Sequence, residues 1–297
     1  MPIEIGAVIN ANEITAQSIN QIKNAGFKTI NIFFWESLEE IDLNNLAKIM
    51  YGCEIPVSCL SIFGNPLRED IKGEQIRQAW KTLIKNSSLF GNPYVSGFAG
   101  RKCGASVNDS IVSWKTFFSE LLDYSYEKNA KGILFENCRM GDTWKNGKWN
   151  IAINPDAWNL MFNEINDEKM GFQWEPCHQV ESFIDPLKQL TNWIPKIKHI
   201  HGKDGKIDYN LLSEKGYFGK NKVFEYTLPG SGDTSWQSIF EILENNNYKG
   251  TVDLEFQGES FIQNLNRAKK SLRYLQQSRA SVFSEIKIIN NSSLLSK

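Results

Sequence analysis

The 297-residue sequence has few of the residues from which soft metal sites and disulfides are built, with five cysteines and only three histidines. No two cysteines form a Cys-x-x-Cys pair, so we expect no zinc site built on thiolates. The odd cysteine count fits thiols that stay reduced, and we therefore expect a cytoplasmic protein. Residues 1–6 lack a basic segment followed by an apolar one, so no signal peptide is expected.

Positive charge is also sparse and scattered. The net charge is −1, and no run of basic residues is longer than a pair such as Lys269-Lys270. A protein that binds nucleic acid through bulk charge needs a basic surface, so no nucleic-acid partner is predicted. No apolar run approaches the length of a membrane-spanning helix, and no membrane partner is predicted either.

Short apolar segments alternate with segments of helical period along most of the chain. Eight segments are predicted strands, at residues 3–9, 28–34, 56–62, 94–99, 132–136, 171–174, 196–201 and 251–256. Seven are predicted helices, at residues 14–25, 38–50, 71–85, 109–128, 155–165, 235–245 and 261–277. The helix at 109–128 is expected to begin at Asn108 or Asp109. Residues 205–230 are expected to leave this alternation, with a short helix and an extended piece at 223–228.

This alternation predicts a single (β/α)₈ barrel, because strands that are apolar on both sides pack as parallel strands covered by helices. The alternative is an open, doubly wound sheet, which favours a glycine-rich loop after its first strand. Residues 9–12 read Ile-Asn-Ala-Asn and contain no glycine. We predict one catalytic domain over residues 1–277 and a loosely packed tail over residues 278–297.

Acidic or imidazole groups follow four consecutive predicted strands. They are Glu136, Glu175 with the nearby His178, His201, and Glu255. Any single glutamate at such a place is more often a solvated loop residue or a helix cap. In a barrel all four strands end at the same rim, where carboxylates crowded together would repel one another. A divalent cation such as Mn²⁺, Mg²⁺, Co²⁺ or Zn²⁺ would relieve that repulsion and keep positions open for substrate oxygens.

Two of the three histidines, His199 and His201, are two residues apart and therefore face the same side of a strand. One interpretation is that both point into a functional cavity. The alternative is a structural pair, hydrogen-bonded beneath a loop. His199 would lie one layer deeper than His201, where it would support a ligand or simply hydrogen-bond in the core.

Four short motifs make the chain similar to the sugar phosphate isomerase/epimerase family, which has a xylose-isomerase-like barrel. Residues 136–140, Glu-Asn-Cys-Arg-Met, resemble the family's Glu-Asn-Cys-Pro-Met, and residues 175–178, Glu-Pro-Cys-His, resemble Asp-Pro-Ser-His. Residues 199–204, His-Ile-His-Gly-Lys-Asp, resemble His-Val-His-Ala-Lys-Asp. Residues 228–236 resemble Leu-Pro-Gly-x-Gly-Asp-x-x-Trp. The motifs are specific as a set and weak one by one.

The resemblance implies a site whose residues can be named. The implied ligands of one divalent ion, with Mn²⁺ as first choice, are Glu136, Glu175, His201 and Glu255. The implied proton-handling or substrate-binding groups are His178 and Lys203. Arg139, His199 and Trp174 are further predicted substrate contacts that do not come from the resemblance. The chain departs from the family at three positions, since Glu175 replaces aspartate, Gln257 replaces a glutamate, and Arg139 replaces proline.

The resemblance implies a metal-dependent sugar isomerase or epimerase with a small-molecule sugar substrate; a homo-oligomer is left open. The reaction would be proton abstraction next to a carbonyl through a metal-stabilised enediolate. Glu136 and Glu255 would remove and return the proton, and His178 would hold a hydroxyl or carry a proton, its alternative being a helix cap. Aromatic faces such as that of Trp174 would stack on the sugar, although tryptophans are more often core residues.

Other functions fit the same pattern. A metal-dependent dehydratase or lyase on a keto-sugar or keto-inositol would need the same first step. A non-catalytic sugar-binding barrel is the alternative from a different class. A zinc nuclease of the apurinic-site class would need more than the three histidines present and a basic surface.

Overall fold

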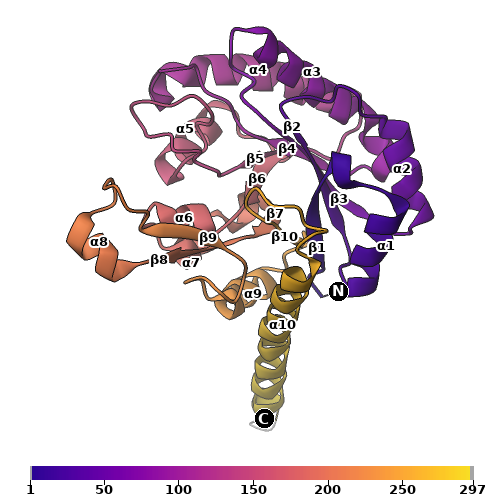
Figure 1. Ribbon diagram of the computed structural model, residues 1–297, viewed down its shortest axis with the longest axis vertical. Coiled ribbons are helices and arrows are strands. Elements are labelled where there is room, and N and C mark those ends of the chain that lie inside the picture. The colour runs from indigo at the N-terminus through magenta and orange to yellow at the C-terminus, as the bar shows by residue number, and fades with distance from the viewer. Residues whose placement is uncertain (1, 295–297) are drawn as a thin grey trace.

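The computed structural model describes the backbone of residues 2–294 and the side chains of residues 2–282. Eight parallel strands close into a barrel in the order β1-β10-β7-β6-β5-β4-β3-β2, and helices surround it (Figure 1). The strands are β1 (Ile5–Asn10), β2 (Ile30–Trp35), β3 (Val57–Phe63), β4 (Tyr94–Gly97), β5 (Ile133–Glu136), β6 (Met170–Trp174), β7 (Ile197–Gly202) and β10 (Val252–Leu254). The predicted barrel and its eight strands are confirmed.

Ten α-helices are present in the described part of the chain. They are α1 (Ala16–Ala25), α2 (Leu43–Gly52), α3 (Ile71–Asn86), α4 (Val107–Glu127), α5 (Pro155–Glu164), α6 (Cys177–Glu181), α7 (Pro186–Trp193), α8 (Tyr209–Lys215), α9 (Trp236–Asn245) and α10 (Leu265–Leu294). The sequence prediction missed α6 and α7, which have only five and eight residues and therefore too few turns for a clear period.

Polar side chains fix the helix starts. Thr15, Asp42, Asp70 and Asn154 each accept a hydrogen bond from a backbone N–H in the first turn of the helix that follows. The predicted start of α4 at Asn108 or Asp109 is wrong, because Ser106 caps this helix by accepting from the Asp109 backbone N–H at 3.1 Å.

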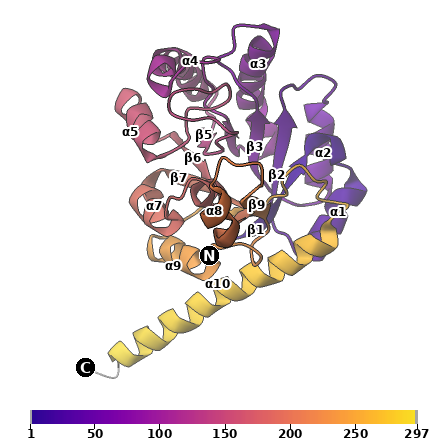
Figure 2. The ribbon, with the colours of Figure 1, turned by 60° about the vertical axis from the view of Figure 1, so that its left-hand side comes forward.

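A small antiparallel hairpin leaves the barrel directly after β7. It consists of β8 (Asp204–Ile207) and β9 (Phe224–Thr227), with α8 between them. The hairpin and α8 lie on the side of α6, and Figure 2 shows them in front of the barrel. The predicted excursion with a short helix and an extended piece is thus confirmed, and it places one wall beside the last strands of the barrel.

The barrel interior contains a buried polar layer instead of an apolar one. Six side chains on six strands share hydrogen bonds there, namely Asn31, Ser61, Ser96, Gln173, His199 and Asp253. The apolar core lies outside the barrel, between strands and helices, where Trp158 contacts Phe172 and Trp114 contacts Phe135. A fully hydrogen-bonded layer of this kind gives the groups above it a rigid floor.

Helix α10 is longer than the predicted helix at residues 261–277 and extends beyond the rest of the molecule in both ribbon views (Figures 1 and 2). Arg279 on this helix donates to the Ile3 carbonyl, and Val282 is buried. Residues 295–297 lie outside the described residues, as do the side chains from residue 283 onward. The predicted loose packing of residues 278–297 therefore stays a prediction. Among the described helices, none combines the length and apolar character needed to cross a bilayer.

Gly6 provides a test of how the barrel closes. It lies in β1 opposite Asp253 of β10, and a Cβ added there would lie 2.0 Å from Thr29 Oγ1 and 2.2 Å from Asp253 Oδ1. We predict that Gly6→Ala lowers the free energy of unfolding by about 1–3 kcal/mol in urea titrations, because neither neighbour can move without losing a buried hydrogen bond. The control is Gly52→Ala, where a Cβ meets nothing within 4 Å. Equal stability of the two variants would contradict the prediction.

Candidate metal centre and active site

Side chains from four adjacent strand ends meet at the carboxyl rim of the barrel. Glu136 ends β5, Glu175 follows β6, His201 lies near the end of β7, and Glu255 follows β10. One ligand atom of each lies within 4.8 Å of the others. The strands β5, β6, β7 and β10 are consecutive neighbours in the barrel, so four residues distant in sequence form one group at this rim. The structure therefore brings together the predicted ligand set.

His201 lies at the centre of this group. Its Nδ1 is 3.1 Å from Glu136 Oε1 and 3.1 Å from Glu255 Oε2, and its Nε2 is 2.8 Å from Asn31 Oδ1. Asn31 Oδ1 also accepts from Gln173 Nε2, which fixes the orientation of the amide. An Nε2–H that donates to Asn31 leaves the Nδ1 lone pair facing the carboxylates, which is the tautomer that a metal ligand requires.

Lys203 bridges two of the carboxylates. Its Nζ is 2.9 Å from Glu175 Oε2 and 2.9 Å from Glu255 Oε2, and the residue is only 2% exposed. Burial acts to lower the pKa of Lys203, but the two carboxylates outweigh it and hold the pKa well above its usual value. Lys203 is therefore a fixed positive charge at the edge of the group, and its predicted role in substrate binding stays a prediction.

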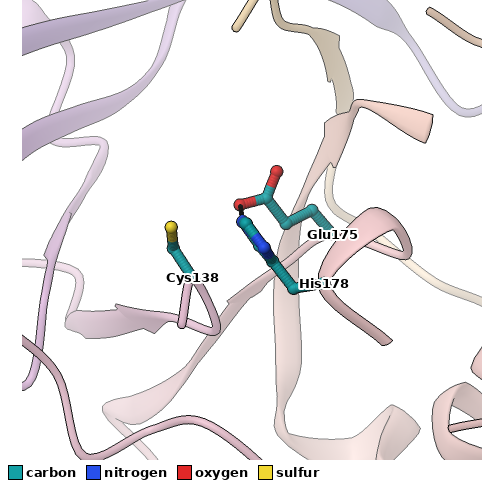
Figure 3. A group of neighbouring side chains, drawn as sticks. All are labelled: Cys138, Glu175 and His178. Atoms are coloured by element: carbon teal, nitrogen blue, oxygen red, sulfur yellow. Dashed lines mark ion pairs between the residues drawn. The ribbon is translucent and has the colours of Figure 1, made fainter. Parts of the chain in front are cut away.

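His178 extends the group from α6. Its Nε2 lies 2.8 Å from Glu175 Oε1, and its Nδ1 lies 3.5 Å from Glu181 Oε2 (Figure 3 shows the Glu175 side). Tyr226 of the hairpin donates to Glu181 Oε2 at 3.1 Å. The alternative role of His178 as a helix cap is wrong, because His178 lies inside α6 and this helix has no side-chain cap.

Burial and mutual repulsion set the charge states of the carboxylates. Burial raises the pKa of Glu136 to about 7, and Glu175 adds to the rise. For Glu175 the burial effect is outweighed by Lys203 and His178, which hold its pKa well below the usual value. Burial would also lower the pKa of His201, but Glu255 and Glu136 raise it to about 10. The raised pKa values mean that Glu136 and His201 tend to stay protonated, which balances part of the negative charge of the group. A divalent cation could balance the same charge in place of these protons.

His199 lies one layer below this group, inside the polar floor. Its Nδ1 is 3.1 Å from Gln173 Nε2, and its Nε2 is 2.7 Å from Asp253 Oδ2. Asp253 also accepts from Thr29 at 2.7 Å and from Ser58. Both ring nitrogens are therefore engaged, and His199 does not join the other predicted substrate-binding residues at the rim.

Two predicted substrate contacts are placed differently from the expectation. Trp174 points outward from the barrel, because its neighbours Gln173 and Glu175 point inward, and its Nε1 donates to Gln189 of α7 at 2.7 Å. It is a core residue, so the predicted stacking of Trp174 on a sugar is wrong. Arg139 is near the site, but its guanidinium is paired with Glu181 at 2.9 Å.

The aromatic residues that do face the rim come from other strands. Trp35 is 48% exposed and lies 6.1 Å from the Trp149 ring, and Phe63 lies 6.5 Å from the His201 ring. A cavity of about 470 Å³ includes Trp35 and Glu255 in its lining. Another, of about 530 Å³, includes Glu255 and Tyr226. Glu255 thus lies between two open spaces, and a sugar could reach the carboxylate group from either.

The donor set fits a hard or borderline divalent cation. Three carboxylates and one imidazole offer oxygen and nitrogen atoms at short range. Buried carboxylates need compensating positive charge, which His178 and Lys203 give to Glu175 and which a cation could give to the whole group.

The sequence alone did not identify Glu181, Tyr226 or Asn31 as members of the site. Glu181 carried a weak signal, because it lies three residues after His178 and shares a helix face with it. Tyr226 arrives from the hairpin and Asn31 from the opposite side of the barrel, and neither position has a signal in the linear sequence.

A family model described as the xylose isomerase-like TIM barrel matches residues 19–278. The chain belongs to this family. An inosose dehydratase from Clostridium tetani (strain Massachusetts / E88) is 34% identical over 111 residues, which cover 36% of this chain and only 37% of that relative.

Solved structures share the fold at low identity. An L-ribulose 3-epimerase superposes with a TM-score of 0.69 at 14% identity, over 95% of this chain and 97% of that one. A xylose isomerase-like TIM barrel protein from Mycobacterium smegmatis, in complex with magnesium, gives 0.67 at 13%, over 93% and 98%. These similarities show the barrel fold.

His201 tests the ligand group. We predict that His201→Ala abolishes binding of Mn²⁺ measured by elemental analysis after dialysis, a larger loss than the roughly 10–100-fold typical of residues that only support a ligand. The control is His199→Gln, which we expect to retain the ion because His199 lies below the group. Unchanged metal content in His201→Ala, with an unchanged circular dichroism spectrum, would remove His201 from the ligand set.

Proposed function

We propose that this protein is a divalent-metal-dependent sugar isomerase or epimerase that removes a proton from the carbon next to a carbonyl. The observation that carries the proposal is the convergence of Glu136, Glu175, His201 and Glu255 at the rim. The L-ribulose 3-epimerase structure supports it through the shared fold. The expected substrate is a small sugar or cyclitol, and the expected location is the cytoplasm.

A bound divalent ion, with Mn²⁺ first and Mg²⁺, Co²⁺ or Zn²⁺ as alternatives, would supply Lewis acidity toward the carbonyl. The residues that would hold it are the four of the rim group. Glu136 and Glu175 are buried in the folded protein, so the reacting carbon of a bound substrate would lie in a pocket with little water. Interactions between charges are strong in such a pocket.

Glu136 and Glu255 are the proposed bases. They approach His201 Nδ1 from strands on either side of β6 and β7, each at 3.1 Å. An epimerase must take a proton from one face of the substrate carbon and return it to the other, so two carboxylates that approach from different directions suit this reaction. An isomerase would use one of them to move the proton between neighbouring carbons.

Lys203 and His178 are proposed to bind and orient the substrate. The Lys203 ammonium would attract the oxygen on which negative charge develops as the enediolate forms. The His178 ring would hold a substrate hydroxyl or exchange a proton with it, oriented by Glu181 on its far side. Trp35 offers an aromatic face at the mouth of the site.

A second candidate is a dehydratase that acts on a keto-sugar or keto-cyclitol. The specific observation in its favour is the similarity to inosose dehydratases, which spans little more than a third of each chain. The first step would be the same proton abstraction. The enediolate would then expel the hydroxyl on the next carbon, and His178 would donate the proton with which it leaves as water.

Glu255 tests the proposed base. We predict that the wild-type protein loaded with Mn²⁺ exchanges deuterium from D₂O into the carbon next to the carbonyl of a bound ketose, as measured by NMR. Glu255→Gln should lose this exchange at least 100-fold, because an amide cannot accept the proton. The control is Glu241→Gln, an exposed position on α9. Exchange at the wild-type rate in Glu255→Gln would show that another group is the base.

The products separate the two candidates. We predict that a screen of keto-sugars and keto-inositols yields a product of unchanged mass with inverted or shifted functional groups, read by mass spectrometry and NMR. A product lighter by one water would assign the dehydratase instead. Both outcomes require deuterium exchange in the previous experiment. If none of the screened compounds shows exchange, the proton abstraction that both candidates share is rejected.

A further inference from the structure

A further cavity opens at the amino end of the barrel, opposite the rim that carries the candidate metal centre. Its volume is about 520 Å³, and residues at the starts of β3, β4 and β7 line it, together with the loops that precede those strands. His199 is part of the lining, so the cavity reaches the lower side of the polar floor. Barrel enzymes carry out their chemistry at the carboxyl rim, so the proposed reaction makes no use of this end of the barrel.

Two β-bulges turn polar side chains toward this cavity. The pairing of β3 with β2 passes over Ser58, and the pairing of β7 with β6 passes over Lys198. A bulge adds one residue to a strand and redirects its side chain. Ser58 Oγ donates to Asp253 inside the barrel, and a Cβ on the inward-facing Gly171 would lie 2.9 Å from Lys198 Cγ. Both added residues therefore face the interior, and both line the cavity.

The charged groups of this cavity have one sign. Lys131, Lys198 and Lys249 belong to its lining, and among the described residues no carboxylate does. Within the same part of the chain, none of these three ammonium groups forms an ion pair with a carboxylate. The Lys131 ammonium lies 4.5 Å from the centre of the Tyr94 ring, which holds it at the cavity wall. A hollow lined by positive charge without counter-charge attracts anions.

Asp253 lies in the polar floor above the cavity, but its carboxylate already has its partners. It is fully buried, its Oδ2 is 2.7 Å from His199 Nε2, and its Oδ1 accepts from Thr29 at 2.7 Å. Ser58 donates to it as well. Three donors satisfy this carboxylate within the floor, so it does not need the lysines of the cavity as partners. Their charge is left for a ligand that enters from solvent.

We propose that this cavity at the amino end of the barrel binds a small phosphate-bearing molecule. Lysine meets phosphate as a point charge, and several ammonium groups around one space suit a dianion. Arginine, whose planar fork matches a carboxylate, is absent from the lining among the described residues. The set of side chains therefore favours a phosphate group over a carboxylate as the charged part of the ligand.

The size and the walls of the cavity give room for more than the phosphate. Its volume of about 520 Å³ falls within the roughly 300–1,000 Å³ of small-molecule sites. Pro195, Ile197 and the Tyr94 ring add apolar surface to the lining, on which the carbon part of a phosphate ester would rest. Binding at this end does not depend on what the protein catalyses, so it can be tested without a substrate.

Calorimetric titration of the full-length protein with glycerol 3-phosphate tests the site. Divalent ions are removed first by chelation, so that phosphate cannot bind a metal at the rim. We expect saturable binding of one molecule per chain in the wild type. Lys198→Met should weaken it roughly tenfold or more, because a hydrogen bond between charged groups is lost. The double variant Lys131→Met, Lys198→Met should abolish it, whereas Lys198→Arg keeps the charge and should keep most of the affinity.

Lys48→Met, an exposed position on α2, is the matched control and should bind as the wild type does. A parallel titration with inorganic phosphate separates two sources of the same group. Tighter binding of the ester assigns a phosphorylated small molecule, and equal or tighter binding of the free ion assigns inorganic phosphate. Absence of binding of both compounds to the wild type, or undiminished binding in the double variant, would overturn the proposal. Thermal melting confirms that each variant is folded.

Discussion

The organising constraint in this protein is the placement of two buried carboxylates and a third, partly buried one around one imidazole. Charges at such short range in a poorly hydrated pocket are far too costly without compensation. Compensation comes from Lys203, which contacts two of the carboxylates, and from protons on His201 and Glu136. Burial and Glu175 raise the pKa of Glu136, and Glu255 and Glu136 raise the pKa of His201 against the effect of burial, so both groups hold their protons more firmly. A divalent cation would do the same work with one group. The electrostatics of the group are therefore compatible with a divalent cation, whatever reaction the site carries out.

The polar floor of the barrel supports this arrangement. Asn31 fixes one nitrogen of His201, Gln173 fixes Asn31, and Asp253 with His199 completes the layer. Each member is held by a neighbour on another strand, so the orientation of the His201 ring depends on barrel closure. Such a layer is less forgiving than an apolar core, because the loss of one partner leaves a buried polar atom unsatisfied.

The sequence predicted the strands and the four rim residues. Strand ends and charged residues can be recognised locally in a sequence, and a parallel barrel places all of its strand ends at the same rim. It could not predict that Trp174 faces the helices, since this depends on which residues of β6 point inward. It also missed Asn31 and Tyr226, which reach the site from β2 and from the hairpin. Contacts between elements far apart in sequence leave no local pattern.

The hairpin has its root in the site itself. Lys203 immediately precedes β8, and Asp204 is anchored by Trp236 Nε1 at 3.0 Å and by the Gly205 backbone. The tip, with α8, is mostly exposed and makes few contacts with the barrel. Tyr217, just beyond α8, is the link from the tip to the site, and its hydroxyl donates to Glu181 Oε1 at 3.1 Å. Insertions or deletions at the tip could reshape the entrance for substrates of other sizes during evolution while the ammonium of Lys203 stays where it is.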